Sequence, residues 1–359
     1  MKAIAVEREG DRPVVVERER PTLTAGEALV RTLRVGVDGT DHDVIAGTHG
    51  SPPGGADHFV LGHEAVGVVE EAGETRFSPG DVVVPTVRRP PGESNEYFER
   101  GEPDMAPSGT YHERGILGEH GFMAEYFTSP EEFLVRIPDS IADVGFLVEP
   151  LSVAEKAIDL AYASRSSFDW APESALVLGN GGLGLLTLAL LDDAYDYDRL
   201  YCLGRRDRPD PTIDIIEDLG ATYVDSRETP VDAVAAEHEP MDLVFEATGY
   251  AKHAFETIEA LAPNGVGALL GVPEPWEFEV DGGRLHRELV LQNKALVGSV
   301  NSNVRHFAAA AEALPSLPAE FLDVLVTGVY DLDDFEAAFE DDDTTIKTAV
   351  QFSSYEERR

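Results

Sequence analysis

Residues 175–191 read ALVLGNGGLGLLTLALL, a short apolar strand, a glycine-rich turn and an apolar helix in direct succession. Gly179, Gly181 and Gly184 form a GxGxxG pattern. Its first glycine makes a tight turn, its second lets the backbone approach a pyrophosphate, and its third packs the helix closely on the strand. The start of the helix then offers free N–H groups to phosphates. The stretch therefore predicts a dinucleotide site, the alternative being a merely glycine-rich turn.

Strands and helices continue to alternate on the C-terminal side of this turn. Helices are expected at 212–219 and 254–261, among others. Strands are expected at 175–178, 200–203, 221–224, 243–247, 266–271 and 295–300. Six strands alternating with helices predict an α/β fold of the Rossmann type, a doubly wound parallel sheet.

The rest of the chain reads differently. Residues 1–127 are short alternating strands broken by Gly, Pro and Asp, which predicts a β-rich unit. Residues 84–111 are polar and lack periodicity, as in a functional loop or protruding lobe. After Asn301 we expect an alanine-rich helix (306–314), an acidic helix (332–343) and a strand (346–352), which are too little to fold alone. We therefore expect a catalytic domain of residues 1–151 and 302–359, and a nucleotide-binding domain of residues 152–301.

Composition excludes several kinds of partner. The 359 residues carry 28 basic and 68 acidic side chains, a net charge of −40 that repels nucleic acids and anionic membrane surfaces. Only five of the basic residues are lysines, an acidic and lysine-poor composition that indicates a halophile whose protein requires molar salt. The single Cys202 cannot form an intramolecular disulfide, and the N-terminus has no apolar targeting segment. We expect a cytoplasmic protein.

The end of the second strand of the parallel sheet indicates the cofactor. NAD sites place a carboxylate about 20 residues after the glycine pattern, where it binds the ribose 2′-hydroxyl. This chain has Gly204-Arg205-Arg206 there, with room for a 2′-phosphate and two guanidinium groups to hold it. The sequence therefore predicts NADP, with NAD as a weaker alternative. The other reading of Arg205 and Arg206 is a solvated basic loop.

Two short motifs lie in the β-rich region, Asp38-Gly39-Thr40-Asp41 and Gly62-His63-Glu64. With the nucleotide domain, they resemble the zinc-dependent medium-chain dehydrogenases, which join a GroES-like catalytic domain to a Rossmann domain. That family usually has Cys where this chain has Asp38, but aspartate is a competent zinc ligand. The alternative is that Asp38 merely caps a turn. The family's four-Cys structural zinc lobe would fall in residues 84–111, which contain no cysteine, so the resemblance implies one catalytic zinc per chain and no structural zinc.

Within that family the archaeal, halophilic glucose dehydrogenase group is most similar, through ERGI (113–116), GFMAE (121–125), FLVEPL (146–151) and GSVN (298–301). The resemblance implies metal ligands at Asp38, His63, Glu64 and Glu149, and catalytic roles for Thr40, Asp38 and Glu64. The implied sugar contacts are Thr40, Glu113, Glu149 and Asn301. The implied nucleotide contacts are Gly179, Gly181, Gly182, Leu183, Gly184, Arg205, Arg206, Ala247, Thr248, Gly249, Gly271, Val272, Pro273, Ser299, Val300 and Asn301. Val153 departs from the pattern, because some sugar-binding relatives have an acid there.

The activity that this resemblance implies is the NADP-preferring oxidation of β-D-glucose to glucono-1,5-lactone by zinc-assisted hydride transfer. The alternatives are a polyol, secondary-alcohol or threonine dehydrogenase of the same fold, or a nucleotide-binding homologue without catalysis. The expected partners are a small-molecule sugar and further copies of the chain, as a dimer or tetramer.

Overall fold

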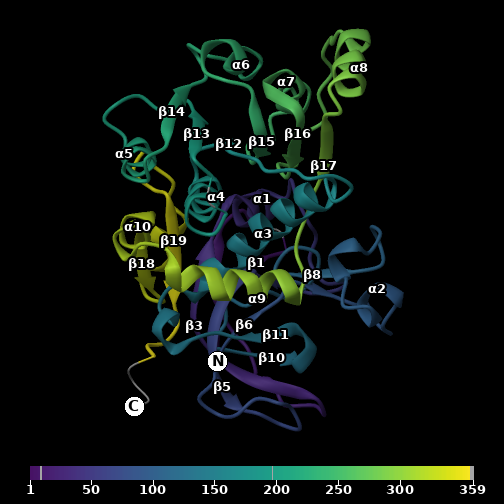
Figure 1. The fold of residues 1–359 in the computed structure, drawn as a ribbon. Coiled ribbons are helices and arrows are strands. Elements are labelled where there is room, and N and C mark those ends of the chain that lie inside the picture. The colour runs from purple at the N-terminus through teal and green to yellow at the C-terminus, as the bar shows by residue number, and fades with distance from the viewer. Residues whose placement is uncertain (9, 196, 356–359) are drawn as a thin grey trace. The chain divides into compact units, whose positions relative to one another are not determined.

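The computed structural model describes residues 1–8, 10–195 and 197–355 (Figure 1). The chain forms two compact units. The first contains Met1–Ser152, Asn301–Ser316 and Val326–Arg359, and the second contains Val153–Val300 and Leu317–Leu325. The segment Leu317–Leu325 differs from our expectation, since we had placed it in the first domain. Its helix α10 (Ala319–Leu325) contacts α5 (Pro211–Asp218) of the second unit. The sequence pattern does not predict this packing.

The second unit is built on a six-stranded, wholly parallel sheet in the order β14-β13-β12-β15-β16-β17. Its strands are β12 (Ser174–Leu178), β13 (Arg199–Gly204), β14 (Thr222–Asp225), β15 (Met241–Glu246), β16 (Leu261–Leu269) and β17 (Ala295–Gly298). The strand that precedes the glycine turn lies inside the sheet, and the order reverses beside it, between β12 and β15. This is the doubly wound arrangement, so the predicted fold class is confirmed.

Helices connect these strands, and apolar side chains fill the space between the layers. Every residue of β12 is buried, as expected for a parallel strand that is covered on both faces. The helices are α3 (Val148–Ala163), which leads in from the first unit, α4 (Gly182–Asp193), α5 (Pro211–Asp218), α6 (Val234–Glu237), α7 (His253–Ala260) and α8 (Gly282–Leu291). One core cluster consists of Leu176, Leu178, Leu203, Val224, Val231, Val234, Met241, Val244, Ala260 and Leu261.

The first unit is β-rich, with a seven-stranded sheet and two three-stranded sheets. The large sheet runs β11-β6-β5-β3-β19-β18, and β10 also pairs with β3. The C-terminal strands β18 and β19, yellow in Figure 1, thus lie beside the purple β3, and the predicted return of the tail is confirmed for them. The strands of this unit are β1 (Lys2–Glu7), β2 (Pro13–Glu17), β3 (Glu27–Val37), β4 (His58–Val60), β5 (Glu64–Glu71), β6 (Val82–Pro85), β7 (Arg88–Arg89), β8 (His112–Arg114), β9 (Gly118–Glu119), β10 (Tyr126–Pro130), β11 (Leu134–Arg136), β18 (Val326–Asp331) and β19 (Lys347–Gln351).

The described residues of the first unit form few and short α-helices. These are α1 (Gly39–Ala46), α2 (Glu96–Glu99) and α9 (Val304–Ala313). The alanine-rich helix predicted at 306–314 corresponds to α9. The prediction of an acidic α-helix at 332–343 was wrong, because this segment forms only the 3₁₀ turn Phe335–Phe339. Aspartate has a low helix propensity, and like charges three or four residues apart repel one another, so this segment gains little from an α-helix.

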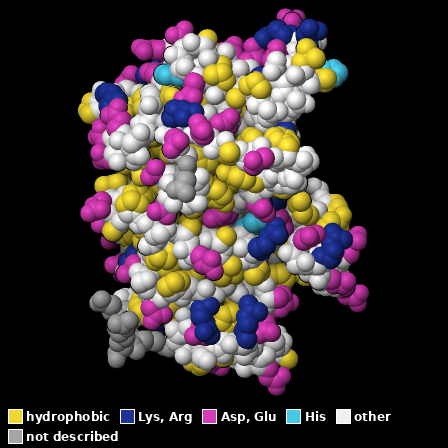
Figure 2. Space-filling view, viewed as in Figure 1, with side chains coloured by type: hydrophobic (Ala, Val, Ile, Leu, Met, Phe, Trp, Pro, Cys, Tyr) yellow, Lys and Arg dark blue, Asp and Glu magenta, His cyan; other side chains and the backbone are white. Residues whose placement is uncertain are grey.

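Acidic side chains, magenta in Figure 2, are spread over the visible face of the molecule instead of gathering in one patch. This distribution fits a net charge of −40 carried mainly at the surface. No helix among the described residues is long and apolar enough to cross a membrane.

Candidate active site

Asp38 occupies the joint between β3 and α1, where it is the N-cap of the helix. Its Oδ1 accepts hydrogen bonds from the backbone N–H groups of Thr40 (2.9 Å) and Asp41 (3.2 Å). Its Oδ2 accepts from Thr40 Oγ1 at 3.2 Å and lies 3.6 Å from His63 Nε2. One oxygen therefore caps the helix while the other is directed at His63, so capping and metal binding are compatible in this residue.

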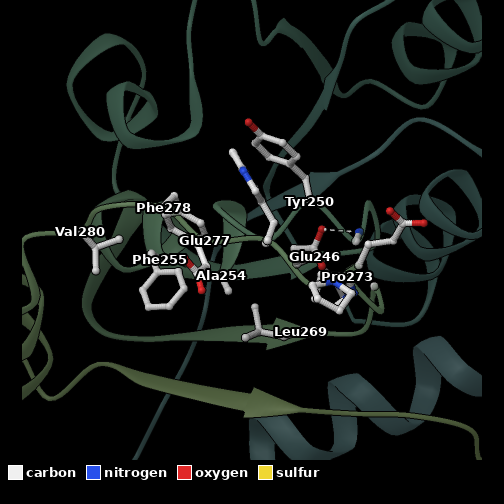
Figure 3. Close-up of a pocket in the computed structure, with 15 residues that line it drawn as sticks. Glu246, Tyr250, Ala254, Phe255, Leu269, Pro273, Glu277, Phe278 and Val280 are labelled. Atoms are coloured by element: carbon white, nitrogen blue, oxygen red, sulfur yellow. Dashed lines mark hydrogen bonds between the residues drawn. The ribbon is translucent and has the colours of Figure 1, made fainter.

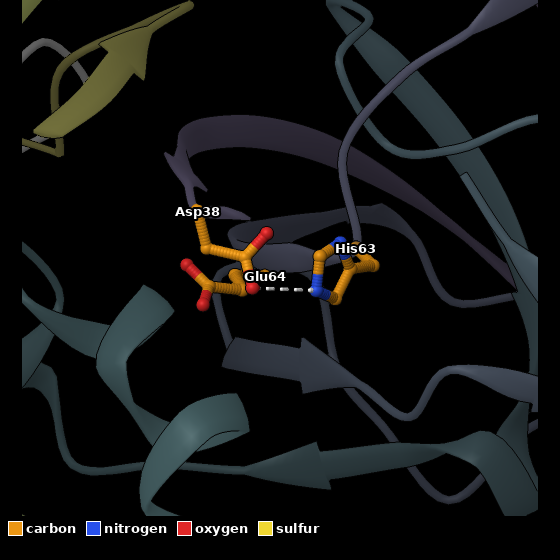
Figure 4. Close-up of side chains that lie close together, drawn as sticks. All are labelled: Asp38, His63 and Glu64. Carbon is orange, nitrogen blue, oxygen red and sulfur yellow. Dashed lines mark ion pairs between the residues drawn. The ribbon is translucent and has the colours of Figure 1, made fainter. Parts of the chain in front are cut away.

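His63 and Glu64 enter the same site at the start of β5, and both are buried. One potential ligand atom from each of Asp38, His63 and Glu64 can be chosen so that all lie within 4.8 Å of one another, as Figure 4 illustrates. His63 Nδ1 is buried without a hydrogen-bond partner in the described part of the chain; its nearest charged neighbour is Asp41 Oδ1, 4.0 Å away. The ring nitrogen that faces the Asp38 carboxylate is Nε2, 3.6 Å from Oδ2. An imidazole nitrogen gathered with carboxylate oxygens in this way fits a zinc ion.

Glu149 lies in the first turn of α3 and is buried. It is outside the three-residue group, although its carboxyl interacts electrostatically with His63, Glu64 and Asp38. Burial raises the pKa of Glu149 to about 8, and the charges of Glu64 and Asp38 add to this effect. Without a cation in the site, this side chain therefore favours its protonated form.

The neighbouring groups are shifted by the same mixture of burial and charge. Burial alone would raise the pKa of Asp38, but the charges of His63 and Lys347 outweigh it and hold that pKa below its usual value. Burial alone would lower the pKa of His63, but Asp38 reverses the shift and raises it well above normal. The pKa of Glu64 is raised by burial, an effect that Lys347 partly offsets. The site is thus a buried excess of carboxyl groups that favours a cation.

Lys347, the first residue of β19, is the residue of this site that sequence reasoning missed. Its Nζ lies 2.5 Å from Glu64 Oε2 and donates to the backbone oxygen of Val37 at 3.1 Å. The available signal was a lysine inside an apolar strand, IKTAVQF, of a chain with five lysines in all.

Two expected sugar contacts, Glu113 and Asn301, lie together in the first unit. Asn301 Nδ2 donates to Glu113 Oε1 at 3.3 Å, and Arg88 Nε donates to the same oxygen at 3.0 Å. Asn301 has φ +57°, a left-handed conformation that Asn adopts more readily than most residues. Both of these bonds end on Oε1, which leaves Glu113 Oε2 to accept from a ligand.

The three motif glycines differ in geometry. Gly179 has φ +110°, which L side chains rarely adopt. A Cβ at Gly184 would lie 1.9 Å from the Gly179 oxygen, whereas one at Gly181 would meet open space. Gly181 caps α4 without a side chain, so the first N–H groups of that helix face this space. These are the tight turn, the close packing and the open approach that a dinucleotide site needs.

The tip of β13 carries the two arginines expected at the 2′-phosphate. Arg205 is exposed, and Arg206 is half-buried with Nε 3.9 Å from Asp210 Oδ2. The next residue, Asp207, forms an exposed ion pair with Arg227, whose Nη2 lies 2.7 Å from Asp207 Oδ1. Two guanidinium groups are therefore present at the strand tip as expected, and one of them, Arg206, is paired with Asp210.

The turns after β15 and β16 border a cavity of about 830 Å³ (Figure 3). Its lining includes Gly249, Gly271 and Pro273 of the expected cofactor turns, together with aromatic residues such as Tyr250 and Trp276. Of the remaining expected contacts, Val272 is 70% exposed, Val300 is 51% exposed, and Ser299 has a buried, unpartnered Oγ. The lining of this cavity includes none of the metal-site residues, none of the motif glycines and neither Arg205 nor Arg206.

Models of two known protein families match long stretches of the chain. A model of the "Glucose dehydrogenase C-terminus" matches residues 142–352, and one of the "Alcohol dehydrogenase GroES-like domain" matches residues 24–139. The chain belongs to the glucose dehydrogenase family. The resemblance to zinc-dependent medium-chain dehydrogenases is thereby confirmed.

Members of the glucose dehydrogenase family match nearly the whole chain. The glucose 1-dehydrogenase of Haloferax mediterranei is 67% identical, covering 99% of this chain and 100% of the relative, and that of Haloarcula marismortui is 65% identical with the same coverage. A solved structure of the Haloferax mediterranei glucose dehydrogenase in complex with NADP, Zn and gluconolactone has a TM-score of 0.97, with coverage of 99% and 100%. A structure of a D38C mutant of that enzyme has the same TM-score.

Proposed function

We propose that the chain is a zinc-dependent glucose 1-dehydrogenase that oxidises β-D-glucose to glucono-1,5-lactone and reduces NADP. The observation that carries this function is the buried group of Asp38, His63 and Glu64, in which His63 Nε2 faces the Asp38 carboxylate. Those donors fit zinc, and the full-length relatives are glucose 1-dehydrogenases. The polyol and threonine alternatives have no comparable support.

Zinc in this group polarises the anomeric hydroxyl, and bound NADP accepts the hydride. In the balanced reaction, C1 of glucose loses a hydride to the nicotinamide and its hydroxyl loses a proton, which gives the lactone, NADPH and H⁺. Asp38 and His63 hold the metal, with Glu64 and Glu149 as further or water-mediated ligands. The Asp41 carboxylate lies 4.0 Å from Nδ1, the other ring nitrogen of His63.

Thr40 Oγ1 donates to Asp38 Oδ2, which leaves its lone pairs free to accept the proton of the anomeric hydroxyl in a hydrogen bond. Glu113 Oε2 accepts from another sugar hydroxyl, because Arg88 and Asn301 hold the carboxylate through Oε1. The sugar is thus held at two points, Thr40 beside the reacting oxygen and Glu113 at a distance from it.

The cofactor is held by the first turn of α4 and by Arg205 and Arg206, with the turns after β15, β16 and β17 completing the contacts. Arg205→Ala/Arg206→Ala should raise the KM for NADP about 10- to 100-fold and change the KM for NAD little. This corresponds to a loss of about 1.4–2.8 kcal/mol for the two charge-assisted contacts to a 2′-phosphate together. An unchanged NADP/NAD preference would place the 2′-phosphate elsewhere.

The direct test is purification in molar salt, measurement of zinc per chain, and NADPH formation with glucose, galactose, xylose, sorbitol and threonine. We expect one zinc per chain and fastest turnover with glucose. Stoichiometric zinc with no glucose oxidation would contradict the substrate, and a zinc-free protein that binds NADP would favour the non-catalytic alternative.

The proposal extends to a homo-oligomer in the cytoplasm. The edge strand β17 leaves backbone groups for pairing. Near it in sequence, Val290 is 61% exposed, Leu291 58% and Val300 51%. The buried, unpaired Cys202 fits a reducing compartment. Light scattering in molar salt distinguishes a monomer from a dimer or tetramer.

A further inference from the structure

A buried lysine contacts the metal-site carboxylate Glu64. Lys347 is 5% exposed, and its Nζ lies 2.5 Å from Glu64 Oε2. Its other contact is the backbone oxygen of Val37, one residue before Asp38. A buried ammonium group is costly unless it is paired, so the fold uses this lysine for a specific partner.

The position of the Glu64 carboxylate is also shaped by a glycine. A Cβ at Gly36 would lie 2.1 Å from Glu64 Oε2 and 2.9 Å from Phe146 Cδ2. Gly36 pairs with Glu64 across β3 and β5 and with Ala349 across β3 and β19. Three neighbouring strands therefore supply the carboxylate, the space that it occupies and the cation that it contacts.

We propose that Lys347 is a positioning residue that holds Glu64 in the space beside Gly36 and thereby limits its binding to the catalytic metal. This inference rests on the proposed zinc-dependent function. A carboxylate already paired with an ammonium group is a weaker metal donor than a free one. With Lys347 in place, zinc keeps fewer anionic ligands and stays a stronger Lewis acid towards the sugar hydroxyl.

Lys347→Met tests this role, with Lys347→Arg as the charge-preserving control. Freed from its partner, Glu64 should bind the metal more fully. We expect the zinc dissociation constant, measured by chelator competition, to fall about tenfold, and kcat for glucose to fall 10- to 100-fold with the KM for NADP unchanged. In the cobalt-substituted protein, the visible absorption should weaken as the coordination number rises. Lys347→Arg should restore most of each property.

A second pair of variants separates positioning from simple charge. In a Glu64→Gln background, Lys347→Met should no longer change the zinc dissociation constant or the cobalt spectrum, because its effect passes through Glu64. A shift of equal size in that background would overturn the proposal in favour of bare electrostatic repulsion. Unchanged zinc affinity and cobalt spectrum in a folded Lys347→Met protein would also overturn it, leaving only a structural contact with Val37.

Gly36→Ala provides the test if Lys347→Met does not fold, since the added methyl group displaces Glu64 from the same space. The proposal expects the same cobalt spectral change, and a spectrum identical to the wild type would overturn it. Wild-type protein without zinc would overturn both the proposed function and this inference. Wild-type protein with zinc and glucose turnover, but with variants that leave metal binding unchanged, would overturn only the inference.

Discussion

The first unit contains two clusters of buried charged side chains. In one the acidic groups are in excess, and in the other the central charge is paired within the protein. In the metal-site cluster, the carboxyl groups of Asp38, Glu64 and Glu149 outnumber the cations, and a ring nitrogen of His63 is unpaired. In the second cluster Arg88 is 2% exposed and has three acceptors. Its Nε donates to Glu113, and its Nη1 donates to two backbone oxygens. A buried charge that is paired within the protein supports the fold, whereas a buried excess of carboxylates fits the binding of a cation.

The Arg88 cluster also explains how residues 84–111 are held without cysteines. The two backbone oxygens are those of Pro103 and Asp104, at 3.2 Å and 2.9 Å, and the guanidinium lies 3.6 Å from the Tyr111 ring centroid. Asn303 Nδ2 donates to Asp104 Oδ1 at 2.9 Å. Hydrogen bonds from one buried arginine thus tie together the segment in which the wider family is expected to use a structural zinc.

The largest expected effect follows removal of the imidazole from the metal-site cluster. His63→Ala should lose most of its zinc, since the neutral nitrogen donor is lost and three carboxylates remain. Its kcat/KM for glucose should fall by at least about 1,000-fold. NADP binding in the second unit should survive. Metal analysis and steady-state kinetics measure both properties. The exposed His49→Ala is the matched control, and equal losses in both variants would contradict the assignment.

The second effect is on stability and concerns the balanced cluster. Arg88→Met should lower the free energy of unfolding by about 3–5 kcal/mol, because two backbone oxygens lose their donor and the buried Glu113 carboxylate loses its cationic partner. Arg100→Met removes an exposed pair with Glu96 and should cost less than about 1 kcal/mol. Denaturant unfolding in molar salt compares the two. A similar small loss in each would show that Arg88 does not hold the segment.

In the metal-site cluster, removal of a charged group should raise the stability of the zinc-free protein instead of lowering it. Glu149 has a folded-state pKa of about 8, above its unfolded value, so its contribution to stability is present below about pH 4.5 and is lost as pH rises towards 8. In zinc-free protein, Glu149→Gln should therefore gain roughly 1–2 kcal/mol over wild type at pH 8 and little at pH 5. Thermal unfolding at the two pH values, without and with zinc, measures the gain. A destabilised zinc-free variant at pH 8 would mean that Glu149 is already paired.

The sequence predicted the parts of this molecule that depend on local patterns. The glycine turn and the alternating strands and helices predicted the doubly wound parallel sheet. Asp38 and His63 lie in short motifs at strand ends, so their position could be anticipated. Lys347 and Arg88 could not, because their partners depend on strand register: β19 against β3, and β7 against β8. Nor could α10 be assigned to its unit, since its apolar face is compatible with either core. Long-range pairing, which local periodicity does not encode, decided each of these outcomes.

The smallest expected effect divides the two oxygens of a single residue. Asp38→Asn keeps a side-chain oxygen that caps α1 but removes the anionic ligand, whereas Asp38→Cys supplies a strong zinc ligand and removes the cap. Zinc-free Asp38→Cys should therefore lose about 0.5–2 kcal/mol of stability yet bind zinc at least as tightly as wild type and keep turnover. Asp38→Asn should show near-normal zinc-free stability with weaker zinc binding. Unfolding of the zinc-free proteins and zinc titration measure these properties separately. If Asp38→Asn retained wild-type zinc affinity and activity, Asp38 would be a helix cap alone, and the metal would have to be held by His63, Glu64 and Glu149.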